Sequence, residues 1–390
     1  MLEGGYLTES LKPRILRHEI MEQDAGKTIK EYLMRKIGFS SKQLSRFKYR
    51  KDGILLNGEK RYVNAVLMQG DVLEIRLTQG GEAAEEDPAR PLSGQGGYVA
   101  ARDGRLQKIW VRPAEWLSSR YPLKILYEDQ DILAADKPSG VVCHPSPGHF
   151  NDTLSNQVAE HLGRIGQELD VRVTGRLDKD TSGIVVFALN TETAAQLIKQ
   201  RQAEMKCRFS FDLSLAEMPF FVDDSGNQPD LDPESILSLM SSGENYKLYI
   251  ARVRGHFGNR LTGTVDYPLR RESADSFRMT AAGDGKEART HYCVLKQMPD
   301  GTSLAACRIE HGRTHQIRVH MSLSGHPIVG DRMYGPEAEG VSKMQEAFEG
   351  EKTGPLMLHA YRAGFRQPFT GEPIRIEAAL PEWAMAIRAR

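Results

Sequence analysis

From Leu123 onward, the apolar residues of this chain come in short runs that turn residues interrupt. Typical runs are "GIVVFAL", "KLYIARVRG", "THYCVLKQ" and "SLAACRIE". Short runs rich in Val, Ile, Tyr and Phe between turn signals are typical of strands. Helical spacing is confined to the neighbourhoods of residues 153–166 and 191–205. The pattern predicts a large α+β domain with a central mixed, mostly antiparallel sheet flanked by helices.

A smaller unit is expected before it, over residues 18–77. Residues 27–37, "KTIKEYLMRKI", carry apolar side chains at helical spacing. Residues 40–51, "SSKQLSRFKYRK", begin with serines that suit a helix cap and continue as a basic helix. Short strand-like runs follow, separated by Asn-Gly and Gly-Asp turn signals. We therefore predict a small α/β domain here.

Two further segments lack the composition of a core. Residues 78–120 include "QGGEAAEEDPARPLSGQGG" and are expected to form a flexible linker. Residues 209–245 contain eight Asp and Glu and no Lys or Arg, and are expected to be an exposed acidic insertion. A partner or regulatory role is an alternative to simple tolerance of a surface insertion. The large domain would then span residues 121–390.

Charge and cysteine content restrict the partners and the compartment. The net charge is zero, but residues 11–62 carry 14 Lys and Arg against six Asp and Glu. That excess suggests a polyanionic partner, with a solvated helix face as the alternative. The four cysteines form no CxxC pair, which argues against a zinc ribbon or a disulfide scaffold. No stretch approaches the ~20 apolar residues of a membrane span, so we expect a soluble cytoplasmic protein.

The most charged turn of the large domain is "TGRLDKDTSG", in which Asp178 stands before a run of strand formers. Asp178, Asp180, Ser182 and Gly183 match the first ligand positions of a calcium-binding EF-hand loop. The final position, however, falls on Leu189, and a strand follows instead of a helix, which excludes that site. Two alternatives remain: a plain turn, or a catalytic carboxylate that an arginine keeps ionised.

The segment "HGRTHQIRVHMSLSGHPIVGDRMYG" could supply that arginine as Arg318. The alternating Ile317, Val319 and Met321 suggest a strand or the start of a helix. Its histidines have no HExxH spacing and no carboxylate between them, so contacts to backbone or phosphate are expected and a metal is not.

Six segments of this chain, taken in order, resemble the RluA/RluD-type family of RNA pseudouridine synthases. They are "ILYEDQDILAADKPSGVVCHP", "GRLDKDTSGIVVFAL", "YKLYIARVRG", "KEARTHY", "GRTHQIRVHMSLSGHPIVGDRMYG" and "LHAYRAGFRQPFTGE". The resemblance covers about residues 121–385, apart from the acidic insertion. Residues 18–77 similarly resemble the small RNA-binding domain, or alpha-L motif, of these enzymes, a ribosomal small-subunit protein and tyrosyl-tRNA synthetase.

The resemblance implies an isomerase that converts uridine to pseudouridine in RNA without a cofactor or metal. Asp178 would be the essential residue, attacking the ribose or removing a proton from it, after which the base detaches, turns over and rejoins through a ring carbon. Tyr249 would stack on the base, and its hydroxyl could handle a proton. Arg318 would pair with Asp178. A buried strand tyrosine is the ordinary alternative for Tyr249.

Other positions have supporting roles in this interpretation. Arg176 would hold the RNA backbone or fill the gap left by a flipped uridine, and a strand would put it on the same face as Asp178. The RNA-binding candidates of the small domain are Lys42, Arg46, Lys48, Arg50 and Lys51. The structural positions of the cleft are Lys137, Pro138, Gly183 and His315.

One departure from the family pattern concerns the residue before "RLD". Gly175 stands where the family most often has histidine, which puts in doubt the RNA contact that this histidine would make. The expected partner is RNA, ribosomal more than transfer, bound by a monomer. The rival hypothesis is an RNA-binding or ribosome-assembly protein with vestigial catalysis, and the joint presence of Asp178, Tyr249 and Arg318 argues against it.

Overall fold

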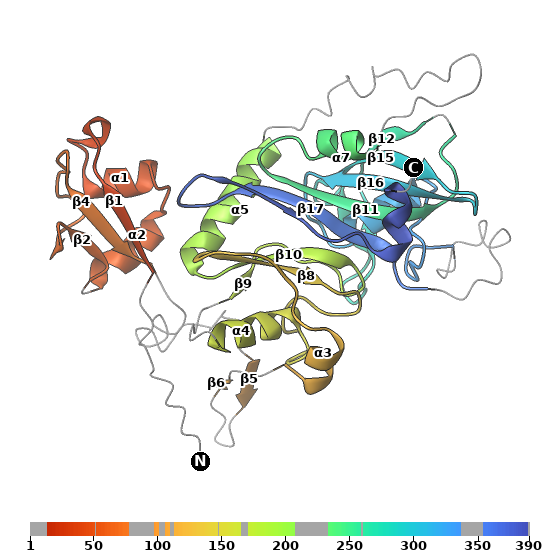
Figure 1. Cartoon of the computed structure of the whole chain (residues 1–390), viewed down its shortest axis with the longest axis horizontal. Coiled ribbons are helices and arrows are strands. Elements are labelled where there is room, and N and C mark those ends of the chain that lie inside the picture. Colours follow the sequence, from red (N-terminus) through yellow and green to blue (C-terminus); the bar gives the residue numbers. More distant parts are fainter. Residues whose placement is uncertain are drawn as a thin grey trace.

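The chain forms a small body from its N-terminal residues and a large body from the rest (Figure 1). The small body contains a four-stranded sheet, and the large body contains a ten-stranded sheet. The structure, a computed structural model, describes residues 14–50, 52–77, 97–100, 106–109, 113–146, 148–164, 171–206, 233–258, 260–336 and 354–388.

The small body has the predicted helices and short strands. Its elements are β1 (Ile15–Glu19), the 3-10 turn η1 (Glu22–Asp24), α1 (Ile29–Arg35), α2 (Ser41–Tyr49), β2 (Ile54–Leu56), β3 (Glu59–Lys60) and β4 (Val72–Arg76). The strands form an antiparallel sheet in the order β1-β4-β2-β3. Thr28 and Ser40 form capping boxes with Glu31 and Gln43, and these fix where the two helices begin.

The large body is built on one long sheet. Its strands are β7 (Ile125–Glu128), β8 (Ile132–Lys137), β9 (Arg172–Val173), β10 (Ser182–Ala188), β11 (Tyr246–Arg254), β12 (Thr262–Asp266), β15 (Arg289–Gln297), β16 (Thr302–Ile309), β17 (Leu358–Arg366) and β18 (Pro373–Glu377). The order is β12-β15-β16-β11-β17-β10-β8-β7, with β18 beside β17 and β9 beside β10. Only the β10–β17 pair is parallel among these strands. The expected mixed, mostly antiparallel sheet is confirmed.

Helices and smaller ladders flank this sheet. They are α3 (Glu115–Arg120), α4 (Leu154–Arg164), α5 (Thr191–Lys206), α7 (Pro233–Met240), α8 (Gln316–Leu323), the 3-10 helix η3 (Glu382–Ile387), the pair β13 (Leu269–Arg271) and β14 (Met279–Ala281), and the pair β5 (Gly97–Ala100) and β6 (Leu106–Ile109). The helices expected near 153–166 and 191–205 are confirmed as α4 and α5.

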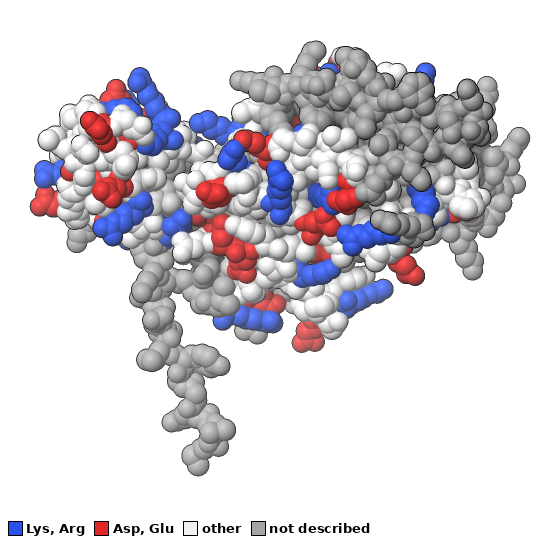
Figure 2. Space-filling view, turned by 45° about the horizontal axis from the view of Figure 1, so that its top comes forward, with Lys and Arg blue, Asp and Glu red and all other residues white. Residues whose placement is uncertain are grey.

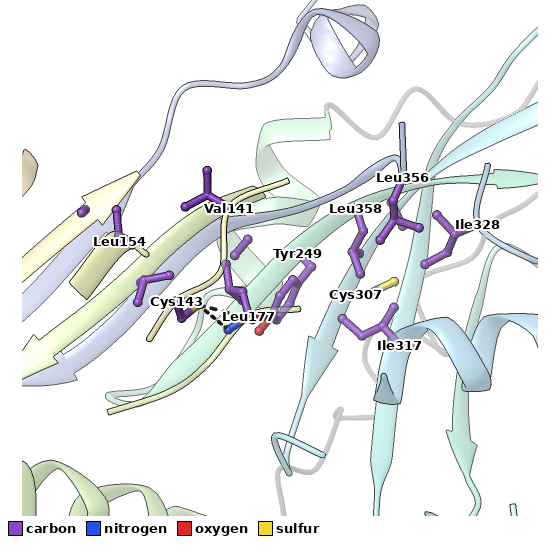
Figure 3. Packing of buried hydrophobic residues seen from close by; sticks show 14 of the residues in the cluster. Val141, Cys143, Leu154, Leu177, Tyr249, Cys307, Ile317, Ile328, Leu356 and Leu358 are labelled. Carbon is purple, nitrogen blue, oxygen red and sulfur yellow. Dashed lines mark hydrogen bonds between the residues drawn. The ribbon is translucent and has the colours of Figure 1, made fainter. Parts of the chain in front are cut away.

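Both faces of the sheet are covered because its strands alternate their apolar side chains. In β10, Val185 and Phe187 join the largest core cluster, which includes Leu154 of α4. The intervening Val186 joins a second cluster with Leu197 of α5. Figure 3 shows part of the first cluster, with Leu177 lying beside Tyr249. The loop that leads to Asp178 is therefore anchored in the main core.

Two expected segments are more structured than their composition suggests. The expected linker contains the β5–β6 pair and α3, whose Leu117 is fully buried in the main core. The expected acidic insertion contains α7, whose residues 236, 237 and 240 are buried where the helix packs against β15 and β16. Three apolar positions on one helix face were enough to dock α7, and acidic composition alone concealed them. The acidic residues 209–232 lie outside the described residues.

The small body contacts the large one at a buried carboxylate. Asp131, at the start of β8, accepts hydrogen bonds from Arg14 (2.9 and 3.1 Å), Asn190 (3.0 Å) and Gln367 (3.0 Å). The loop between β17 and β18 also reaches the small body (Figure 1), where the rings of Phe369 and Phe39 meet edge to face with centroids 6.4 Å apart. Both contacts come from residues of the large body that lie far apart in sequence.

Gly183 allows the single parallel pairing of the sheet. Its φ is +104°, and an added Cβ would collide with the carbonyl oxygen of Ala360 on β17. We expect Gly183→Ala to lower the free energy of unfolding by about 3 kcal/mol, combining backbone strain with overpacking. Denaturant unfolding measures this change.

Gly371→Ala is the matched control, because Gly371 also has positive φ (+77°) but no atom within 4 Å of its missing Cβ. It should lower the free energy of unfolding by only about 1 kcal/mol. Equal losses in the two variants would show that the β10–β17 contact does not depend on glycine.

Candidate active site

Asp178 lies in an irregular loop between β9 and β10. Its carbonyl oxygen accepts the N–H of Thr181 at 3.2 Å, which closes a turn. The carboxylate is partly accessible, with 24% of the side chain exposed, and Arg176 is exposed two residues earlier. The expectation that a strand places Arg176 and Asp178 on one face is wrong, because pairing with β10 ends at β9, before both residues.

The buried side chain of Lys137 fixes this loop by hydrogen bonds to backbone oxygens. Its fully buried ammonium donates hydrogen bonds to the carbonyl oxygens of Pro138 (2.9 Å), Val141 (2.7 Å) and Lys179 (2.7 Å). Burial lowers the pKa of Lys137 to about 8, although Cys143 and the nearby aspartates oppose the shift. The ammonium thus ties the "DKPSG" turn to the residue directly after Asp178.

Arg318 faces Asp178 from α8. The helix begins at Gln316, so the strand alternative for this segment is wrong. The Nη1 atom of Arg318 lies 3.4 Å from Asp178 Oδ2. Its Nε and Nη2 atoms each lie 2.8 Å from one carboxylate oxygen of Asp331. The two-pronged pair with Asp331 fixes the plane of the guanidinium. The third donor is left pointing at Asp178.

Asp331 is a residue that the sequence did not reveal. Its side chain is fully buried, and Oδ1 also accepts the N–H groups of Met333 (2.9 Å) and Tyr334 (3.1 Å). Burial alone would raise the pKa of Asp331, but the hydrogen bonds and charge of Arg318 and the backbone donors lower it overall. The only signal in the sequence was its place at the end of the apolar run "GHPIVGD".

His315 and Tyr334 complete this wall of the site. His315 has φ +54° directly before α8, and its Nδ1 lies 2.8 Å from the hydroxyl of Tyr334. Its Nε2 is 3.9 Å from Asp178 Oδ2, too far for a hydrogen bond. Burial lowers the pKa of His315, so the ring is neutral near pH 7. Tyr334 also lies under Arg318, with 5.2 Å between guanidinium and ring centroid.

Tyr249 lies on β11, which β17 separates from β10, the strand that follows the Asp178 loop. Residue 360 of β17 pairs with both Gly183 and Tyr249, so the sheet register brings the two segments together. The tyrosine is 5% exposed, and burial followed by the charge of Asp178 raises its pKa well above the usual value. Its hydroxyl therefore stays protonated at neutral pH.

A cavity of about 630 Å³ opens beside Arg318 and the turn that follows Asp178. Arg318 and Asp180 line it, together with Ser139, Arg278, Arg332 and Leu356. This volume is within the usual range for small-molecule sites. Among the described residues, no group of three or more His, Cys, Asp or Glu is arranged to hold a metal ion.

The RNA-binding candidates of the small body lie apart from this cleft. Lys42 and Lys48 of α2 are exposed, Arg46 and Arg50 are partly exposed, and Lys51 lies outside the described residues. On the face shown in Figure 2, lysine and arginine side chains of the small body are interspersed with acidic ones. The structure thus brings together Asp178, Arg318, His315 and Tyr249, and leaves the α2 cations on a separate surface.

Comparisons with known proteins show which proteins this chain is similar to. A protein-family model described as RNA pseudouridylate synthase matches residues 131–207 and 235–323. An uncharacterised RNA pseudouridine synthase of Bacillus subtilis (strain 168), YlyB, is 35% identical over 269 residues, which cover 68% of this chain and 72% of the relative. The ribosomal large subunit pseudouridine synthase D of Zymomonas mobilis subsp. mobilis is 32% identical over 277 residues, covering 70% of this chain and 73% of the relative. A solved structure, human RNA pseudouridylate synthase domain containing 1, is 22% identical, covers 69% of this chain and 95% of that chain, and has a TM-score of 0.43.

Proposed function

Because this chain belongs to the RNA pseudouridylate synthase family and isomerises uridine to pseudouridine in RNA, we propose that Asp178 is its catalytic carboxylate. The observation that carries the proposal is the Arg318 guanidinium 3.4 Å from Asp178 Oδ2, with Tyr249 brought to the same region by the pairing of both Gly183 and Tyr249 with residue 360. Asp178 would attack the ribose of the target uridine or remove a proton from it, which releases the base. The base then turns over and rejoins the sugar through carbon 5, and the hydrogen on that carbon leaves as a proton.

Arg318 and Asp331 would keep the carboxylate ready for this step. The Arg318 guanidinium lies 3.4 Å from Asp178 Oδ2, so its positive charge attracts and orients the carboxylate that would act as the nucleophile or base. Asp331 fixes the guanidinium so that the third donor does not rotate away. No water molecule has to be activated, so a single carboxylate suffices where glycoside hydrolysis uses two.

Tyr249 would hold the detached base. Its ring can stack on a uracil, and its protonated hydroxyl can donate a hydrogen bond while the base turns over. A uridine within a helix must leave the stack to enter such a cavity. Arg176, exposed at the edge of the loop, would contact the RNA backbone or fill the gap that the uridine leaves.

The small domain, residues 18–77, would grip the RNA by its phosphates, and residues 121–390 would form the catalytic domain. We expect Lys42→Gln/Lys48→Gln to weaken RNA binding and to reduce the slope of log K against log salt by about 1.4, since each single-strand phosphate contact contributes about 0.7. Filter binding at several salt concentrations measures this slope.

Lys60→Gln on β3 is a control that removes an exposed lysine from the same body but outside α2. It should leave the slope unchanged. If the α2 variant kept the full salt slope, the phosphate contacts would belong to the large domain.

The proposed substrate is ribosomal RNA of the large subunit, acted on by a monomer in the cytoplasm. Several relatives that match two thirds or more of their length are named ribosomal large subunit pseudouridine synthase D. Within the described residues, no helix is long and apolar enough to cross a bilayer.

The test of the proposed substrate is release of tritium from carbon 5 of labelled uridines. Release from large-subunit ribosomal RNA but not from transfer RNA is expected, and the reverse result would reassign the substrate.

A further inference from the structure

Gly175 leaves a space beside the Asp178 loop that two cations occupy. An added Cβ at Gly175 would collide with Nζ of Lys247, and Nη1 of Arg201 would lie 3.3 Å from it. Lys247 extends from β11 and Arg201 from α5. Two residues that are 46 positions apart in sequence thus place their positive charges next to Gly175. The absence of a side chain at residue 175 makes this arrangement possible.

Within the described residues, neither cation has an anionic partner. No carboxylate forms an ion pair with Lys247 or Arg201, and the one carboxylate lining this space, Glu310, bonds to Arg289 (3.0 Å) and His291 (2.9 Å) instead. Burial and then the charge of Arg201 lower the pKa of Lys247 to about 8. Two repelling cations that are partly withdrawn from water destabilise the fold unless an anion joins them.

Tyr249 places this space next to the proposed active site, because it lines the space itself. Lys247 and Tyr249 are two residues apart on β11 and share one face of the strand. The charges of Asp178 and Arg201 both act on the Tyr249 hydroxyl, the first raising its pKa and the second lowering it. A cavity of about 130 Å³ is present here, lined by Lys247, Arg201, Arg176, Tyr249 and Gly175.

We propose that Lys247 and Arg201 form a subsite for one backbone phosphate of the RNA strand that carries the target uridine. This inference rests on the proposed function, since it takes Tyr249 as the platform for the base. A guanidinium offers a fork of donors and an ammonium adds a compact charge, a combination that suits phosphate oxygens. Gly175 acts as a specificity residue, because a larger side chain there would displace the Lys247 ammonium.

Lys247→Met tests the subsite through both activity and stability. With tritiated large-subunit ribosomal RNA, KM should rise about tenfold and the salt slope of RNA binding should fall by about 0.7, with kcat within about threefold. The thermal unfolding midpoint should stay equal or rise, because an unpaired, desolvated charge is removed. Arg164→Gln, which removes an exposed charge from α4, should change none of these quantities.

A lower midpoint together with an unchanged salt slope would overturn the proposal, since Lys247 would then be a structural residue. Binding of RNA to an Asp178→Asn/Lys247→Met protein, compared with Asp178→Asn alone, gives the same comparison without turnover. The subsite can therefore be judged even if the wild-type protein releases no tritium, a result that would count against the proposed function alone.

Inorganic phosphate serves as a second probe. It should raise the unfolding midpoint of the wild-type protein, and Lys247→Met and Gly175→His should both abolish that rise. Gly175→His should also raise KM, because its ring would occupy the position of the ammonium. Stabilisation by phosphate with RNA affinity unaffected by either substitution would overturn the RNA assignment and indicate a site for a free phosphate compound.

Discussion

Asp178→Asn is expected to lower kcat for pseudouridine formation by about 10⁴-fold or more, because an amide can neither attack the ribose nor accept a proton from it. The shape of the side chain is kept, and the Lys137 hydrogen bonds that hold the loop go to backbone oxygens. RNA affinity should therefore stay within about threefold. Tritium release from carbon 5 reports turnover, and filter binding reports affinity.

Asp180→Asn is the matched control for this result. Asp180 is an exposed carboxylate in the same turn and lies on the other side of Lys179. Its loss should change kcat by less than about tenfold. Turnover that survived in Asp178→Asn would remove Asp178 from the mechanism, and equal losses in both variants would indicate a general effect on the loop.

Arg318→Met should have the second largest effect, and it should act on stability as well as on turnover. The Asp331 carboxylate is fully buried, so removing its guanidinium partner leaves a charge without compensation. Breaking a buried pair in this way destabilises a protein by about 3–5 kcal/mol. Denaturant unfolding should show this loss, and tritium release should fall to background.

The double variant Arg318→Met/Asp331→Leu separates the two effects. With the buried carboxylate also replaced by an apolar side chain, much of the lost stability should return, since apolar pairs often replace buried ion pairs without loss. Turnover should remain at background because Asp178 still lacks its cation. Recovery of activity along with stability would mean that Arg318 serves only the fold.

The sequence predicted the features that depend on local patterns. Alternating apolar residues in β10 and helical spacing in α4 and α5 were sufficient to predict a sheet covered by helices. Helical spacing over residues 27–37 and the capping serines of residues 40–51 predicted the helices of the small body. The family resemblance predicted that Asp178, Tyr249 and Arg318 belong to one site, although the first and last are more than 100 residues apart. The structure then showed how Asp178 and Tyr249 come together: Ala360 pairs with Gly183, just after the Asp178 loop, and also with Tyr249.

Features that depend on tertiary contacts were not predictable in this way. The alternation in "HQIRVH" fits a strand as well as the first turn of a helix, and only packing of α8 distinguishes them. Asp331 resembles any aspartate after a turn until its burial is known. Gly175 looked like a simple loss of histidine, whereas the space it leaves is filled by Lys247 from another strand.

The parallel β10–β17 pair also joins a strand made early in synthesis to one made near its end. Ser182 on β10 bonds to His359 on β17, 177 residues later, and β17 is also the neighbour of β11. Chains emerge from the ribosome N-terminus first, and contacts between distant residues form slowly. In the proposed function, the small body would bind RNA while the strands around Asp178 still lack their central partner. A nascent chain would thus attach to RNA before it can modify it.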